Sequence, residues 1–275
     1  MSVIQNKKKP LVVLTGPTAV GKTKLSIALA KAINGEILSA DSMQVYKHMD
    51  IGSAKIRPEE MEGVPHHLID ILEPWEEFNV VVFQKRCLEC MEQIYDRGHI
   101  PILVGGTGFY IQAVLRGIDF TENEENTEYR EKMEQLAKEK GPEVLHDMLR
   151  KIDPVSAENI HTNNIKRTIR ALEYYELTGE PISVHNEREK ERTSPYNFSY
   201  FVLTDDREKL YARIEDRIDE MMSQGLVDEV RQLKDMGCRK GMTSMQGLGY
   251  KELFPYLAGE CTLEEAVYII KRDTR

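Results

Sequence analysis

Eight residues near the N-terminus carry the clearest chemical signal in this sequence, because residues 16–23 read GPTAVGKT. This stretch matches G-x-x-x-x-G-K-[ST], a pattern in which backbone N–H groups turn toward phosphate oxygens. Its lysine supplies a mobile positive charge, and its final hydroxyl can bind Mg²⁺. We therefore predict that a phosphate group is bound by Gly16, Pro17, Thr18, Ala19, Val20, Gly21, Lys22 and Thr23.

The flanks of this motif are those that a phosphate-binding loop requires. Residues 11–14 (LVVL) are typical of a buried strand, and residues 24–30 (KLSIALA) are typical of a helix. This strand–loop–helix context favours the phosphate-binding interpretation over an ordinary turn. The motif alone leaves open which molecule carries the phosphate.

A carboxylate follows the next predicted strand, which covers residues 36–40 and ends at Asp41. The carboxyl ends of neighbouring parallel strands meet at one edge of a sheet, so Asp41 should face the crevice that holds the phosphate. Asp41 could instead cap a short helix over residues 42–46. Both interpretations are compatible with the local sequence.

A third strand, predicted over residues 100–104 (IPILV), ends in a glycine-rich turn at residues 105–108 (GGTG). Backbone amides of this turn, or the hydroxyl of Thr107, could contact a ligand in the same crevice. An ordinary tight turn explains the pattern equally well.

Three basic residues lie close together on a helix predicted over residues 165–178: Lys166, Arg167 and Arg170. Their spacing places the cations at one edge of that helix, opposite its apolar positions. They could contact a polyanion, or they could form a solvated face that Glu173 and Glu176 partly neutralise.

Arg213 and Arg217 lie one turn apart on another predicted helix. They could face a phosphate together. Alternatively, they could pair with acidic neighbours on the same helix, namely Glu215, Asp216 and Glu220.

Two further patterns favour structural roles. His66 and His67 are strand neighbours whose side chains point to opposite faces, so they cannot easily bind one metal ion. Cys87 belongs to an apolar series at helical spacing and should face the core, which argues against redox or zinc chemistry with Cys90.

Composition limits the class of protein. The chain has 275 residues, is 41% hydrophobic and carries a formal net charge of −9, which argues against nonspecific coating of nucleic acid. Four scattered cysteines do not form a disulfide framework. The N-terminus lacks the apolar region of a signal peptide, and no run of about 18 apolar residues is present. We expect a soluble, cytoplasmic monomer.

The order of predicted elements indicates an α/β fold with two parts. Residues 1–118 and 196–275 should form a P-loop NTPase-like parallel sheet flanked by helices, with a last strand over 200–204 and a long helix from 205 to 233. Residues 119–195 lack buried strands and should form a helical insertion domain, with helices over residues 128–140, 143–151, 154–159 and 165–178.

Several motifs, taken together, resemble the bacterial tRNA dimethylallyltransferases, also called tRNA isopentenyltransferases. They occur in the order GPTAVGKT, DSMQVYKHMDIGSAK, PHHLIDI, PILVGGTGFYI, NIKRTIRALEYYELTG and QGLGYKE. His48 and Ser53 depart from the usual family residues, at positions that we expect to lie outside the chemistry. The chain ends in a basic, helical segment, and the resemblance leads us to expect a further basic helix after it.

The resemblance implies transfer of a dimethylallyl group from dimethylallyl diphosphate to N6 of adenosine 37, in tRNAs that read codons beginning with U. Lys22 and the amides of residues 19–23 would hold the diphosphate, Thr23 would bind Mg²⁺, and Arg217 would add a second cation. Asp41 would accept the N6 proton and Thr107 would position the reacting groups. The implied contacts with the tRNA anticodon stem-loop involve Asp41, Ser42, Met43, Gln44, Lys166, Arg167 and Arg170.

Two other functions share part of this pattern. A P-loop kinase for a nucleoside or another small molecule would use the same loop, an acidic residue after the second strand and an inserted helical lid. The second alternative is a nucleotide-dependent RNA-binding switch without enzymatic activity. Spacing and composition alone favour the kinase, and the family resemblance favours the transferase.

Overall fold

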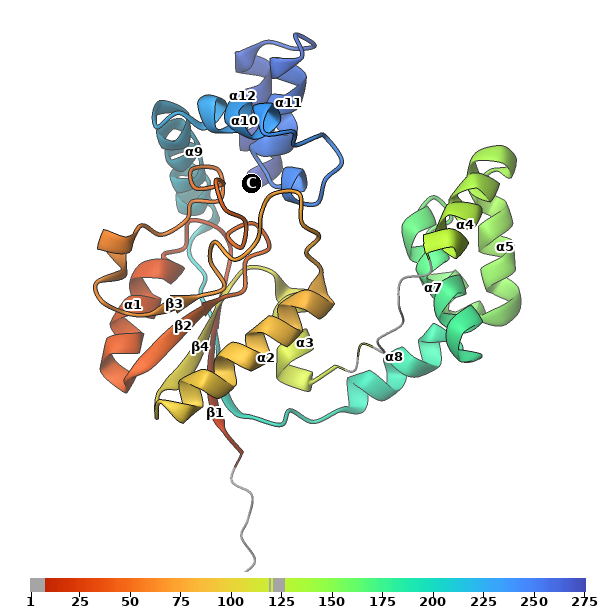
Figure 1. Ribbon diagram of the computed structural model, residues 1–275, viewed down its shortest axis with the longest axis horizontal. Helices are drawn as coiled ribbons and strands as arrows, with labels where there is room; N and C mark the ends of the chain where they lie inside the picture. Colours follow the sequence, from red (N-terminus) through yellow and green to blue (C-terminus); the bar gives the residue numbers. More distant parts are fainter. Residues whose placement is uncertain (1–7, 119, 121–126) are drawn as a thin grey trace, which may run out of the picture. The chain divides into compact units, whose positions relative to one another are not determined.

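A computed structural model describes residues 8–118, 120 and 127–275 (Figure 1). The chain divides into two compact units, one formed by Met1–Leu115 with Pro195–Arg275 and the other by Arg116–Ser194. These divisions fall close to the expected ones after residues 118 and 195. Residues 1–7, where we expect no signal peptide, and residue 119, the expected start of the insertion, lie outside the described residues.

The first unit is built on a five-stranded parallel sheet in the order β3-β2-β4-β1-β5. Parallel strands need crossover segments, and α-helices follow β1, β3 and β4 in the sequence. The predicted α/β fold class is therefore confirmed. The strands are β1 (Pro10–Thr15), β2 (Gly35–Ser39), β3 (His66–His67), β4 (Ile100–Gly105) and β5 (Asn197–Val202).

Helices cover both faces of this sheet (Figure 1). On one face, Ile37 and Ile102 pack with Ile27 of α1 (Lys22–Ile33). Leu38 and Leu103, which follow them in the strands, belong to the cluster on the opposite face. That cluster includes α2 (Val80–Asp96), whose buried residues Phe83, Cys87, Met91 and Ile94 are the predicted apolar series. The alternation of strand side chains thus provides two cores.

The carboxyl edge of the sheet is overlaid by the part of the chain after β5 (Figure 1). This part contains α9 (Arg207–Ser223), α10 (Leu226–Asp235), the 3₁₀ turn η2 (Ser244–Gln246), α11 (Tyr250–Leu257) and α12 (Leu263–Thr274). The prediction of one helix over 205–233 was wrong, because Gly225 adopts a φ of 100° and separates α9 from α10. The final strand begins earlier than predicted, because β5 pairs with β1 along its whole length, from Pro10 opposite Asn197 to Thr15 opposite Val202.

The segment between β2 and α2 is less regular than predicted. The strand expected to contain His66 and His67 stops at His67, because Leu68 and Asp70 adopt positive φ values of 64° and 54°. The irregular region before it contains the short 3₁₀ helix η1 (Pro58–Met61). α3 (Gly108–Arg116) follows β4 directly.

The second unit is helical and has its own apolar core, to which Met133, Leu145, Leu149, Ile169 and Leu172 contribute. Its helices are α4 (Thr127–Lys140), α5 (Pro142–Ile152), α6 (Pro154–Asn159), α7 (Ile165–Thr178) and α8 (Ile182–Glu191). The sequence patterns missed α8, which begins directly after Pro181 and has only a weak apolar stripe. Across the parts of the chain that the structure describes, no helix is long and apolar enough to cross a membrane.

Candidate functional site

The predicted phosphate-binding loop connects β1 to α1, as the motif requires. Ala19 adopts a left-handed φ of 60°, an uncommon conformation for a residue with a side chain. The ammonium group of Lys22 donates to the carbonyl oxygens of Gly16 at 2.9 Å and Pro17 at 2.7 Å. Thr23 lies in the first turn of α1 and is exposed. The Lys22 ammonium group is therefore held beside the loop that is predicted to bind phosphate.

A close approach between two strand ends brings Asp41 and Thr107 together. A Cβ on Gly105 would lie 2.3 Å from the carbonyl oxygen of Ala40, so only glycine fits there. The Thr107 N–H donates to the same Ala40 oxygen at 3.3 Å. The glycine-rich turn is therefore more than an ordinary turn, because it places Thr107 next to the residue that precedes Asp41.

The Asp41 carboxylate closes a turn instead of capping a helix. Its Oδ1 accepts the N–H of Met43 at 2.8 Å and that of Gln44 at 3.4 Å, and residues 42–46 form bends and turns. The predicted helix over residues 42–46 is therefore absent, but Asp41 does accept backbone N–H groups two and three residues later, as a helix cap would. Only one of the two carboxylate oxygens makes these bonds.

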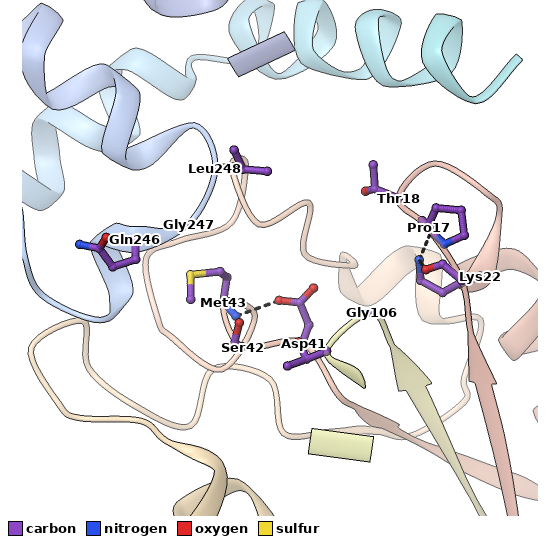
Figure 2. A pocket seen from close by; sticks show the side chains of 12 residues that line it. Pro17, Thr18, Lys22, Asp41, Ser42, Met43, Gly106, Gln246, Gly247 and Leu248 are labelled. Atoms are coloured by element: carbon purple, nitrogen blue, oxygen red, sulfur yellow. Dashed lines mark hydrogen bonds between the residues drawn. The ribbon is translucent and has the colours of Figure 1, made fainter. Parts of the chain in front are cut away.

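The P-loop, Asp41 and Thr107 line one cavity of about 520 Å³. In Figure 2 the Asp41 carboxylate projects into the space between the P-loop and the segment 246–248. The residues that line this cavity are Gly16, Pro17, Thr18, Lys22, Asp41, Ser42, Met43, Gly106, Thr107, Gln246, Gly247 and Leu248.

A second cavity of about 380 Å³ shares Thr18, Lys22, Asp41, Met43 and Leu248 with the first. It contains the rest of the P-loop from Ala19 to Thr23, and Arg217 of α9 enters its wall. Aliphatic side chains form much of the remaining lining: Ile214, Ile218, Met221, Leu226, Leu248 and Ile270. The site thus combines an anion-binding end with an apolar wall.

The charges in this site interact. Burial lowers the pKa of Lys22, the positive charge of Arg217 lowers it further, and Asp41 opposes both effects. Burial also lowers the pKa of Arg217, and Asp41 again opposes this effect. Glu220 also opposes the effect of burial on Arg217, and the two partly desolvated cations favour the binding of an anion.

The two arginines of α9 have different roles. Arg213 forms an ion pair with Asp205 at 2.8 Å, whereas Arg217 makes no ion pair with any residue that the structure describes. Among the described residues, neither arginine forms an ion pair with an acidic residue of its own helix, although the charge of Glu220 acts on Arg217. Arg217 alone is available to a ligand in the second cavity.

The sequence patterns gave no role to several residues of the site. Gln246, Gly247 and Leu248 line the first cavity, although the sequence marked them only as part of the QGLGYKE motif. Ser53, which we expected to lie outside the chemistry, lines the second cavity. The signal was present in the QGLGYKE and DIGSAK motifs, but no local pattern showed that they meet the P-loop.

The residues after Asp41 are placed differently from one another. Ser42 and Met43 line the first cavity. The side-chain amide of Gln44 is already used, because it accepts from Ser39 Oγ at 2.9 Å and donates to the Ser53 carbonyl at 3.3 Å. Gln44 therefore supports the wall of the site in addition to any contact with RNA.

In the helical unit, Lys166, Arg167 and Arg170 are all exposed on α7. Glu173, which was expected to neutralise them in part, is buried and forms two hydrogen bonds to Arg130 at 2.8 and 2.9 Å. The basic edge of α7 is therefore less neutralised than the sequence indicated.

The histidine and cysteine patterns have structural roles. His66 bonds to the Val64 carbonyl and His67 to Glu36, so the two rings do not converge. Cys87 is fully buried, and burial raises the pKa of its thiol. Among the described residues, no group of three or more histidine, cysteine or acidic side chains could hold a metal ion.

Comparison with known families gives two matches. The family model described as IPP transferase matches residues 44–275, and the model described as isopentenyl transferase matches residues 9–71. The two matches overlap and together span the P-loop, both cavities and the helical unit.

Individual relatives match over nearly the whole chain. The tRNA dimethylallyltransferase of Lachnoclostridium phytofermentans is 64% identical over 97% of this chain and 85% of its own length. That of Carboxydothermus hydrogenoformans is 56% identical over 96% of this chain and 85% of its own length. The crystal structure of the tRNA isopentenylpyrophosphate transferase of Bacillus halodurans is 48% identical, covers 98% of this chain and 83% of its own, and has a TM-score of 0.71. From its sequence and its fold alike, the chain belongs to the tRNA dimethylallyltransferase family of IPP transferases.

Proposed function

We propose that this protein transfers a dimethylallyl group from dimethylallyl diphosphate to N6 of adenosine 37, in tRNAs that read codons beginning with U. The product is N6-(dimethylallyl)adenosine. Family membership supports the reaction class. The observation that carries the proposal is the second cavity, where a P-loop and Arg217 share one space with an aliphatic wall. That combination matches a molecule with a diphosphate at one end and a short hydrocarbon at the other.

The diphosphate binds at the P-loop. Backbone amides of residues 19–23, Lys22 and Arg217 surround it, and the two cations offset the charge that develops as the leaving group departs. Lys22 is already held near this position by the Gly16 and Pro17 carbonyls. Little reorganisation is then needed when the anion binds.

Mg²⁺ fits this site through Thr23 together with the diphosphate and water. Mg²⁺ commonly binds through few protein groups plus phosphate oxygens. The exposed hydroxyl of Thr23 in the first turn of α1 suits that mode, and a cluster of acidic ligands is not required. When bound, the ion supplies further neutralisation of charge on the diphosphate.

The hydrocarbon end lies against the aliphatic wall. Burial of this group from water contributes about 25 cal/mol per Å² of apolar surface. A kinase would need to bind the nucleoside part of ATP beside the same loop. The aliphatic lining by Ile214, Ile218 and Met221 is less suited to that polar group. This lining favours the prenyl donor over ATP.

The adenine approaches Asp41 from the first cavity. As the N6–C1 bond forms and the bond between C1 and the diphosphate oxygen breaks, the second Asp41 oxygen accepts the N6 proton. Thr107 lines the same cavity and orients the base. Adenine N6 is a poor nucleophile, so both orientation and proton removal contribute.

Adenosine 37 must leave its stack to reach this cavity. Ser42 and Met43 contact the extruded nucleotide, and Gln44 completes their turn. Lys166, Arg167 and Arg170 contact the phosphates of the anticodon stem-loop, since they form the exposed basic edge of α7.

Mass spectrometry of an anticodon stem-loop tests the proposal directly. The protein is incubated with Mg²⁺, dimethylallyl diphosphate and an unmodified stem-loop that carries adenosine at position 37. We expect a mass gain of one five-carbon unit on that nucleotide and none on a matched stem-loop with guanosine there. A parallel incubation with ATP and nucleosides tests the kinase. Phosphorylated nucleoside without prenylated RNA would refute the proposed function.

A further inference from the structure

A buried carboxylate outside the P-loop holds together two segments that line the second cavity. Glu229 of α10 is only 9% exposed. Its Oε2 accepts the N–H groups of Asp50 at 2.8 Å and Ile51 at 2.7 Å. Its Oε1 accepts the Gly52 N–H at 3.1 Å and the Tyr250 hydroxyl at 2.7 Å.

Every group that contacts this carboxylate is a donor. Hydrogen bonds to an ionised acceptor are stronger than neutral ones, and three of them come here from consecutive backbone amides. Burial and the neighbouring Glu229 raise the pKa of Tyr250 well above its ordinary value, so its hydroxyl keeps the proton that it donates. These bonds fasten the backbone of residues 50–52 to α10.

The two segments that Glu229 connects both reach the ligand cavity. Gly52, Ser53 and Ala54 line the second cavity from one side, and Gly249, directly before Tyr250, lines it from another. The segments also pack closely, since a Cβ on Gly52 would lie 2.6 Å from the Tyr250 ring. Displacing residues 50–52 would therefore move a wall of the cavity.

Other contacts limit that displacement. Lys55 also holds the start of the segment, because its side chain, which is 5% exposed, bonds to the carboxylates of Asp50 and Asp70 at 2.5 Å. The Gln44 amide donates to the Ser53 carbonyl at 3.3 Å. Loss of the Glu229 contacts should therefore shift the segment locally without unfolding the sheet.

We propose that Glu229 is a positioning residue, which sets the width of the cavity for the prenyl diphosphate by fastening residues 50–52 to Tyr250. It does not touch the reacting atoms and acts through the 50–54 segment. This inference rests on the proposed function, because it takes the second cavity to be the donor site.

Glu229→Gln is the sharpest variant because it keeps the side-chain volume. The amide –NH₂ must face donors whichever way it is oriented, and only the Tyr250 hydroxyl can turn to accept from it. At least one backbone N–H then loses its partner. Glu229→Asp keeps the charge on a shorter arm, and Asp228→Asn, an exposed neighbour on α10, is the matched control.

Steady-state kinetics with dimethylallyl diphosphate and the stem-loop separate positioning from general destabilisation. We expect Glu229→Gln to raise KM for the diphosphate about tenfold while kcat and KM for the RNA change about threefold or less. Glu229→Asp should recover part of this loss, and Asp228→Asn should match the wild type. Tyr250→Phe removes the hydroxyl that donates to Glu229 and should raise the same KM by about threefold, which keeps the test available if Glu229→Gln does not fold.

Hydrogen exchange gives a readout independent of activity. In Glu229→Gln, the amides of residues 50–52 should exchange faster than in the wild type, while those of α1 remain unchanged. An unchanged KM for the diphosphate in both Glu229→Gln and Tyr250→Phe would overturn the positioning role, even if exchange is faster. Failure of the wild-type protein to prenylate the stem-loop would instead refute the proposed function, so the two failures are distinguishable.

Discussion

Replacing Asp41 by asparagine separates its chemical role from its structural one. Asp41 Oδ1 accepts the Met43 N–H at 2.8 Å and, more weakly, the Gln44 N–H at 3.4 Å. An asparagine side chain keeps an oxygen at this position, so it retains both bonds. It loses the basic oxygen that would accept the N6 proton. Asp41→Asn should therefore remain folded and fail in catalysis.

The expected sizes follow from these contacts. Turnover should fall by about 10²-fold or more, the usual scale for loss of a general base. The free energy of unfolding should change by less than about 0.5 kcal/mol, since surface changes that keep their hydrogen bonds have small effects. Asp41→Ala should lose a similar amount of turnover and, in addition, about 1 kcal/mol of stability, because the turn loses its acceptor.

Three measurements check this reasoning. Single-turnover prenylation of the stem-loop measures the chemical step, thermal unfolding measures stability, and calorimetry measures binding of inorganic pyrophosphate. Asp41 is the negative charge beside Lys22 and Arg217, so its removal should leave pyrophosphate binding unchanged or tighter. Wild-type turnover in Asp41→Asn would refute the role as a base. Pyrophosphate binding weakened by tenfold or more would show that Asp41 builds the anion site instead.

Four further outcomes are expected. Arg217→Ala should weaken pyrophosphate binding by about ten- to 100-fold, the scale of a lost hydrogen bond to a charged group. Arg213→Ala should change this binding little, because Arg213 forms a surface ion pair with Asp205. Calorimetry on both variants measures the difference. Gly105→Ala should lower stability by about 1–3 kcal/mol in denaturant unfolding, because its Cβ would lie 2.3 Å from the Ala40 oxygen, and an unchanged unfolding midpoint would contradict this packing. Arg97 first, then His67 and His99, hold the pKa of Glu36 at about 2, below its ordinary value of 4.5. Because this pKa is lower in the folded state, the ionised carboxylate stabilises the fold at pH values above the unfolded-state pKa. The free energy of unfolding should therefore fall by up to about 3 kcal/mol as pH falls from 4.5 toward 2. Glu36→Gln should remove this part of the pH dependence of unfolding. Arg167→Ala should weaken stem-loop binding and reduce the slope of log affinity against log salt by about one; an affinity and slope like those of the wild type would indicate a solvated face.

Local sequence patterns predicted the P-loop and its neighbours correctly. The strand before residues 16–23 and the helix after them are encoded by adjacent residues, so their periodicity is visible without tertiary information. The same holds for α2, whose apolar series fixed Cys87 in the core. Asp41 and Thr107 could also be placed, because parallel strands put their carboxyl ends at one edge of the sheet.

Long-range packing decided the remainder. Arg213 and Arg217 are similar in local sequence, and only the path of α9 along the cavity separates the ion-paired residue from the one that lines the cavity. Ser53, Leu248 and Glu229 are brought together from segments far apart in the chain. Periodicity reports which face of an element is apolar but not which other element covers it. The sequence by itself therefore determined the phosphate-binding loop and the strand-end residues, whereas the apolar wall and the carboxylate that supports it depended on the tertiary structure.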